Sequence, residues 1–166
     1  ATGAMVAVLC DALLPNLVQT QEGGPALVHC GPFANIAHGC SSLLATKIGL
    51  SLSDYLITEA GFGFDLGGEK FLDLKCRQLG GWPRLVVLVA TLRALKLHGG
   101  AKLQSASAPD AAALERGMTH LGQHLRSVQH FGLPAVVALN VFPDDSPDEL
   151  RQVELAVAAQ GGKVAR

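Results

Sequence analysis

Hydrophobic positions along the chain follow two different spacings. Apolar residues recur every three or four positions from 114 to 128, which predicts a long helix that Gly132 and Pro134 end. The runs 85–90 and 135–139 are apolar throughout, a pattern typical of strands covered on both faces of a parallel sheet. The second half of the chain therefore predicts helices alternating with buried strands.

The rest of the chain continues this alternation. Ser146–Glu149 has the sequence of a capping box with proline at the first helical position, so a helix should begin there. Another strand is expected where the chain reaches 163–166. The predicted fold class is α/β, with a mostly parallel sheet and flanking helices. Further helices are expected over about 5–13, 41–50 and 67–79, and further strands over 26–29 and 55–58.

Candidate binding and reactive residues follow one predicted strand after another. They occupy 29–39, 59–70, 91–100 and 140–145. The carboxyl ends of parallel strands meet at one edge of a sheet, and open α/β sheets bind their ligands there. This coincidence is the strongest sign of a ligand site that the residues alone provide.

The segment 59–70 is rich in glycine and can be interpreted in two ways. Its free N–H groups could receive an anion, or it could be a tight connection with Asp65 as a helix N-cap. Phe62 and Phe64 either pack inward or form a wall for a flat ligand. A GxxxxGK[ST] phosphate loop does not occur in the sequence.

Two other segments carry candidate binding groups. Arg93 and Lys96 suit a phosphate or carboxylate, although a solvated loop with a surface salt bridge is an alternative. Phe142 and Pro143 could stack on a planar heterocycle while Asn140 offers amide hydrogen bonds. The alternative for this last segment is a turn that leads into the following helix.

Composition excludes several classes of function. With 49% hydrophobic and 16% charged residues, the chain should build a folded core rather than stay disordered. A net charge of −1 without a basic run argues against a nucleic-acid partner, and no apolar stretch approaches the ~20 residues of a membrane span. The four cysteines lack metal or disulfide spacing, which favours a reducing, cytoplasmic location. No metal site is expected.

Seven segments together resemble one enzyme family. The chain is similar to the formate–tetrahydrofolate ligases over nearly all of its 166 residues. The resemblance implies a P-loop-NTPase-like architecture, of which residues 1–166 would be the central part of a catalytic domain without an internal boundary. The matching segments are PNLVQT (15–20), GPFANIAHG (31–39), TEAGFG (58–63), EKF (69–71), KCR (75–77), VATLRALKLHGG (89–100) and FGLPAVVALNVFP (131–143).

The resemblance implies an ATP-dependent ligase of one-carbon metabolism. ATP and formate would give formyl phosphate, and attack by the folate N10 amine would give formyltetrahydrofolate, ADP and phosphate. The family uses Mg²⁺ with ATP and is stimulated by monovalent cations. Its partners are small-molecule substrates, and the full-length protein is expected to be a homo-oligomer.

The resemblance also implies roles for individual residues. Arg93 and Lys96 would stabilise negative charge as catalytic residues, because formyl and phosphoryl transfer need positioned cations. Phe62, Phe142 and Pro143 match positions that line the folate pocket. Supporting positions at the site would be Asn35, His38, Asp65 and Asn140.

Two departures from the family pattern affect these expectations. Phe64 stands where the family usually has alanine. The family's Walker A segment belongs upstream of the matched region, so this chain alone is expected to be inactive while a longer parent is active. A non-catalytic folate-binding module or a gene remnant is the main alternative. Another ligase of P-loop ancestry, acting on a different acid, is a further one.

Overall fold

The fold was determined as a computed structural model that describes residues 1–29 and 41–166. The chain divides into two compact units, Ala1–Trp82 and Pro83–Arg166. The prediction that both belong to one catalytic domain stays a prediction. Each unit is described by itself below.

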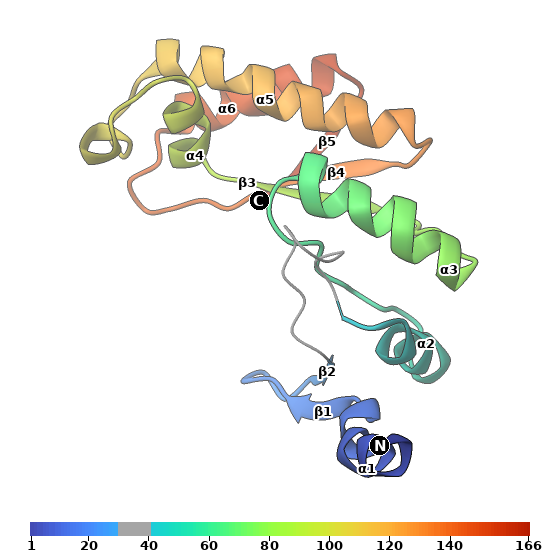
Figure 1. The fold of residues 1–166 in the computed structure, drawn as a ribbon. Helices are drawn as coiled ribbons and strands as arrows, with labels where there is room; N and C mark the ends of the chain where they lie inside the picture. The colour runs from blue at the N-terminus through green and yellow to red at the C-terminus, as the bar shows by residue number, and fades with distance from the viewer. Residues whose placement is uncertain (30–40) are drawn as a thin grey trace. The chain divides into compact units, whose positions relative to one another are not determined.

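In the second unit strands alternate with helices, and they form one sheet and one helical layer. Its strands are parallel in the order β3–β4–β5, and its helices gather on one side of them (Figure 1). This arrangement confirms the α/β class with a parallel sheet and flanking helices. The elements are β3 (Val86–Ala90), α4 (Leu92–His98), η4 (Leu103–Ser105), α5 (Ala111–His130), β4 (Ala135–Leu139), α6 (Pro147–Ala159) and β5 (Lys163–Ala165).

The core of this unit lies between the helices and one face of the sheet. Val137 and Leu139 of β4 are buried there beside Leu114 and Leu125 of α5. The opposite face is different, because Val89 of β3 is 73% exposed. The prediction that both faces of the 85–90 strand are covered is therefore wrong for this chain.

Helices α4 and α5 approach each other closely enough to exclude side chains. A Cβ atom on Gly117 would lie 1.8 Å from the Leu95 carbonyl oxygen, and one on Gly99 would lie 1.7 Å from the Ala113 carbonyl oxygen. Only glycine fits at such a backbone-to-backbone contact. The contact fixes α4, and with it the residues that follow β3.

The first unit contains a hairpin that the sequence patterns did not predict. Strands β1 (Asn16–Gln19) and β2 (Pro25–Val28) are antiparallel, with Gly23 at φ +85° in their connection. The expected strand over 26–29 therefore pairs in a hairpin, not in the parallel sheet. The strand expected over 55–58 is absent, and Tyr55 and Ile57 are almost fully exposed.

The helices of the first unit agree better with the sequence. Ser42 caps α2, since its hydroxyl accepts a hydrogen bond from Ala45 N–H at 3.0 Å. The helix expected over 67–79 begins three residues early and ends at Gly80 with φ +72°. The elements are α1 (Thr2–Leu9), η1 (Asp11–Leu13), α2 (Leu43–Leu52), the π-helical η2 (Phe64–Gly68) and η3 (Phe71–Cys76), and α3 (Arg77–Leu79).

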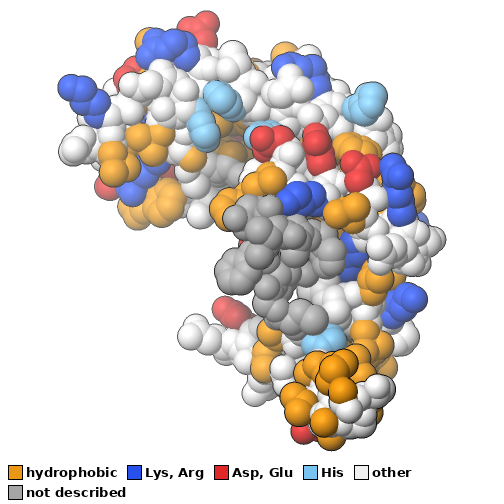
Figure 2. Space-filling view, viewed as in Figure 1, with side chains coloured by type: hydrophobic (Ala, Val, Ile, Leu, Met, Phe, Trp, Pro, Cys, Tyr) orange, Lys and Arg blue, Asp and Glu red, His pale blue; other side chains and the backbone are white. Residues whose placement is uncertain are grey.

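The surface of the first unit is apolar around α1. Met5, Val6, Val8 and Leu9 are all exposed, and Figure 2 shows hydrophobic side chains gathered over this segment. Within residues 1–29 and 41–166, no helix combines the length and apolarity that a membrane crossing requires.

Candidate functional site at the carboxyl ends of the strands

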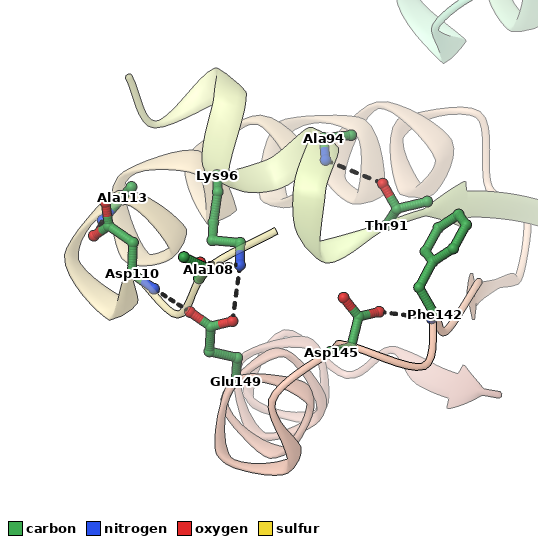
Figure 3. Close-up of polar contacts among 9 residues, drawn as sticks. All are labelled: Thr91, Ala94, Lys96, Ala108, Asp110, Ala113, Phe142, Asp145 and Glu149. Atoms are coloured by element: carbon green, nitrogen blue, oxygen red, sulfur yellow. Dashed lines mark hydrogen bonds and ion pairs between the residues drawn. The ribbon is translucent and has the colours of Figure 1, made fainter. Parts of the chain in front are cut away.

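The start of α4 presents Arg93 directly beyond β3. Thr91 is the N-cap, and its Oγ1 accepts a hydrogen bond from Ala94 N–H at 3.0 Å (Figure 3). Leu92 is fully buried in the core and anchors this first turn. Arg93 follows with a side chain that is 37% exposed.

The turn after β4 is closed by its own side chain. Asp145 Oδ2 accepts a hydrogen bond from Phe142 N–H at 2.8 Å (Figure 3), and Asp145 N–H donates to the Phe142 carbonyl at 3.0 Å. Ahead of the turn, Asn140 N–H donates to the Ala90 carbonyl oxygen at 2.9 Å and extends the pairing of β4 with β3. Phe142 is half-buried and Pro143 is exposed.

These two segments meet at the side chain of Arg93. Its Cζ lies 4.6 Å from the centroid of the Phe142 ring, and its Nη2 lies 3.6 Å from Asp144 Oδ2. The first distance is within the ~6 Å range of a cation–π contact. The structure thus brings Arg93 and Phe142 together, two residues that sequence reasoning placed at the site separately.

An open pocket of about 400 Å³ adjoins the same strand ends. Asn140 lines it, together with Val89 and Ala138 of the uncovered sheet face. The remaining lining residues are Leu139, Val141, Ala165 and Arg166. Its walls are mainly apolar, because it lies on the uncovered face of the sheet.

Lys96 has a different environment from Arg93. Its side chain is 1% exposed, and Nζ lies 3.0 Å from Glu149 Oε2 and 2.8 Å from the Ala108 carbonyl oxygen. Glu149 Oε1 in turn accepts a hydrogen bond from Asp110 N–H at 2.6 Å (Figure 3). The ammonium therefore ties α4 to α6 and to the segment before α5. This geometry favours a structural role for Lys96 over contact with an anion.

The predicted capping box at the start of α6 does not form. Ser146 occupies the N-cap position, but its side chain makes no capping hydrogen bond. In a capping box the Glu149 side chain would bond back to Ser146. Its carboxylate instead accepts hydrogen bonds from the Lys96 ammonium and the Asp110 N–H. Glu149 is a structural part of this network, which sequence reasoning interpreted only as a local cap.

Phe62 in the first unit has an unusual backbone. It is the only non-glycine residue with positive φ, +64°, among the described residues, and its side chain is 75% exposed. Gly67 permits the loop, since a Cβ atom there would lie 1.7 Å from the Gly61 carbonyl oxygen. A non-glycine residue with positive φ carries backbone strain, and such residues cluster at functional sites.

The neighbours of Phe62 bear on two alternatives that the sequence left open. Phe64 is buried, and its ring lies against Gly68, so it packs inward rather than forming a wall. Asp65 is not the N-cap of the following helix, because Gly63 holds that position. Asp65 lies exposed in the first turn, where a carboxylate is favourable to the helix dipole.

Some other candidate residues lie outside the described part of the chain, and others have structural contacts. Asn35 and His38 lie outside the described residues. His29 is structural, with Nδ1 2.6 Å from Ser42 Oγ and Nε2 2.8 Å from the Ala12 carbonyl oxygen. Lys75 was missed by sequence reasoning; it is buried, donates to the Ser41 carbonyl and lies 5.6 Å from the Phe71 ring centroid. Within the described ranges no three potential metal ligands gather.

The parallel sheet with helices on one side defines an α/β protein, and a cluster of Arg93, Phe142 and Asp144 lies at the carboxyl ends of β3 and β4. Comparison with known proteins makes this specific. The formate–tetrahydrofolate ligase family matches residues 1–166, so the chain belongs to that family.

Relatives of known name agree with this membership. The chain is 61% identical over 165 residues to the formate–tetrahydrofolate ligase of Myxococcus xanthus, covering 99% of this chain and 30% of that relative. It is 60% identical over 150 residues to the ligase of Methylobacterium nodulans, covering 90% of this chain and 27% of that relative. The chain therefore spans less than a third of the length of these relatives.

Proposed function

We propose that the protein to which this chain belongs ligates formate to tetrahydrofolate with ATP, by way of formyl phosphate, and that this chain supplies part of the folate site. The observation that carries the proposal is the family match over the whole chain, which includes the segments that build the Arg93–Phe142 cluster. The products would be formyltetrahydrofolate, ADP and phosphate.

The cluster at the carboxyl edge supports a site for the pterin ring. A pterin is flat, and an aromatic ring beside a proline offers a stacking surface of the right shape. Phe142 and Pro143 provide such a surface next to the pocket that Asn140 lines. We assign Phe62 as a folate contact of the first unit on the separate grounds of its exposure and positive φ.

The two predicted catalytic cations are not equivalent. Arg93 is part-exposed, and its ion pair with Asp144 has an N–O distance of 3.6 Å, so an anionic group could exchange with that carboxylate. Lys96 is enclosed by Glu149 and the Ala108 carbonyl. We therefore retain Arg93 as the candidate to stabilise charge on formate or phosphate, and assign Lys96 to the support of α4.

The proposal includes cofactors and an assembly that lie beyond this chain's own residues. ATP would carry Mg²⁺, a monovalent cation would stimulate the reaction, and the full-length protein would be a cytoplasmic homo-oligomer. The sequence contains no GxxxxGK[ST] segment, and no three metal ligands gather among the described residues. We derive no step through ATP or Mg²⁺.

Formation of formyltetrahydrofolate tests the proposal. The natural protein that contains this sequence should form it only when ATP, formate and tetrahydrofolate are all present, and Phe142→Leu should raise KM for tetrahydrofolate more than KM for ATP. Phe131→Leu is the matched control, because Phe131 follows α5, near the amino end of β4. The 166-residue chain alone should not turn over. A parent protein without ligase activity, or parent-like turnover by the chain alone, would contradict these assignments.

A further inference from the structure

The side chain and the backbone of Phe142 are held by different groups. Asp145 fixes the backbone through two hydrogen bonds of 2.8 and 3.0 Å, one in each direction. The ring, in contrast, lies against the guanidinium of Arg93, which comes from α4. The orientation of the ring therefore depends on a residue 49 positions away in the sequence.

The guanidinium is itself steered by a carboxylate of the same turn. Asp144 Oδ2 lies 3.6 Å from Arg93 Nη2, and its side chain is 74% exposed. So exposed a pair adds little to stability, which leaves orientation as its main physical effect. Arg93 Nε is buried and has no hydrogen-bond partner among the described residues, so no bond at that atom turns the guanidinium elsewhere.

We propose that Arg93 is a positioning residue that sets the orientation of the Phe142 ring, with Asp144 holding the guanidinium in place. A phenyl ring has two faces, and the cation occupies one of them. A planar ligand must then stack on the opposite face, which gives a guanidinium–phenyl–ligand stack in that order. That the ligand is a folate rests on the proposed function, whereas the positioning of the ring does not.

This role adds to the contact with formate or phosphate proposed for Arg93 above, because it acts in the free protein before any anion exchanges with Asp144. A direct contact predicts that loss of Arg93 leaves the Phe142 ring where it is. Positioning predicts that the ring moves even when no ligand is present. The orientation of the Phe142 ring in the free protein therefore distinguishes positioning from direct contact alone.

The first arm of the test is nuclear magnetic resonance of the ligand-free chain. Arg93→Met should change the nuclear Overhauser contacts between the Phe142 ring and its neighbours, which report the orientation of the ring, and Phe142→Leu should remove the ring-current shift of the Arg93 side-chain protons. Arg93→Lys should retain part of the native Phe142 contacts, because an ammonium can also lie over a ring. Arg126→Met is the control, since Arg126 is exposed on α5 and bonds to Gln123. Phe142 ring contacts that are unchanged in Arg93→Met would overturn the proposal.

The second arm is the dissociation constant for tetrahydrofolate, measured by calorimetry. Arg93→Met should weaken binding about two- to fivefold, the equivalent of one exposed cation–π contact. Asp144→Asn should weaken it in the same direction and Arg126→Met should not. A moved ring with unchanged affinity would overturn the link between positioning and ligand. No binding by the unsubstituted chain would contradict the folate site itself, and the first arm would still decide whether Arg93 positions the ring.

Discussion

Replacing Lys96 by methionine removes one partner of a buried ion pair. The ammonium contacts Glu149 Oε2 at 3.0 Å and the Ala108 carbonyl oxygen at 2.8 Å, with 1% of the side chain exposed. Methionine fills a similar volume, so the change tests charge rather than packing. It leaves the Glu149 carboxylate buried with a single remaining donor, the N–H of Asp110.

The magnitude follows from the cost of an uncompensated buried charge. Removing one member of such a pair costs about 3–5 kcal/mol of unfolding free energy. In a chain of this length each kilocalorie lowers Tm by about 2–4 °C, so the shift should be roughly 6–20 °C. Lys102→Met is the matched control, because Lys102 is exposed and should change Tm little.

Thermal unfolding by circular dichroism, with hydrogen exchange of the amides of α4 and α5, measures the effect. The double variant Lys96→Met with Glu149→Gln should recover part of the loss, because glutamine is uncharged and keeps an acceptor for Asp110 N–H. A Lys96→Met variant as stable as Lys102→Met would refute the structural role. If that variant also lost folate or anion binding, the catalytic role predicted from the resemblance would be favoured instead.

Two further substitutions test the packing of the second unit and the loop of the first. Gly117→Ala should destabilise the fold strongly in urea denaturation, since its Cβ would lie 1.8 Å from the Leu95 carbonyl oxygen. A Cβ on Gly122 would meet only the ends of the flexible Gln160 and Arg126 side chains, at 3.0 Å or more, so Gly122→Ala should be neutral or stabilising. Equal effects of the two would contradict the close helix contact. Phe62→Asn should keep or raise stability, because asparagine tolerates φ +64°, while weakening tetrahydrofolate binding; a clear loss of stability would show that the ring packs.

Sequence patterns predicted the second unit best, because its helices and strands are set by local periodicity. The stripe from 114 to 128 and the apolar run 135–139 became α5 and β4 as expected. The run 55–58 has equally strand-like composition, but Tyr55 and Ile57 are almost fully exposed and no strand forms there. Pairing partners decide whether such a run becomes a strand, and a local pattern does not contain them.

The candidate site shows the same limit in its side chains. Its place at the carboxyl ends of β3 and β4 follows from topology alone. The partners of individual charged side chains could not be predicted from the sequence. The local pattern assigned Glu149 to a helix cap, whereas in the structure it pairs with the distant Lys96. Likewise, Arg93 and Phe142 were both predicted at the site, but their contact at 4.6 Å requires the fold.

We propose that the turn after β4 presents a stacking surface to folate, and a calorimetric titration of this chain with tetrahydrofolate tests this role most directly. We expect saturable binding that does not need ATP or Mg²⁺, is weakened by Phe142→Leu and is unchanged by Phe131→Leu. Absence of binding, or binding that Phe142→Leu leaves intact, would contradict it.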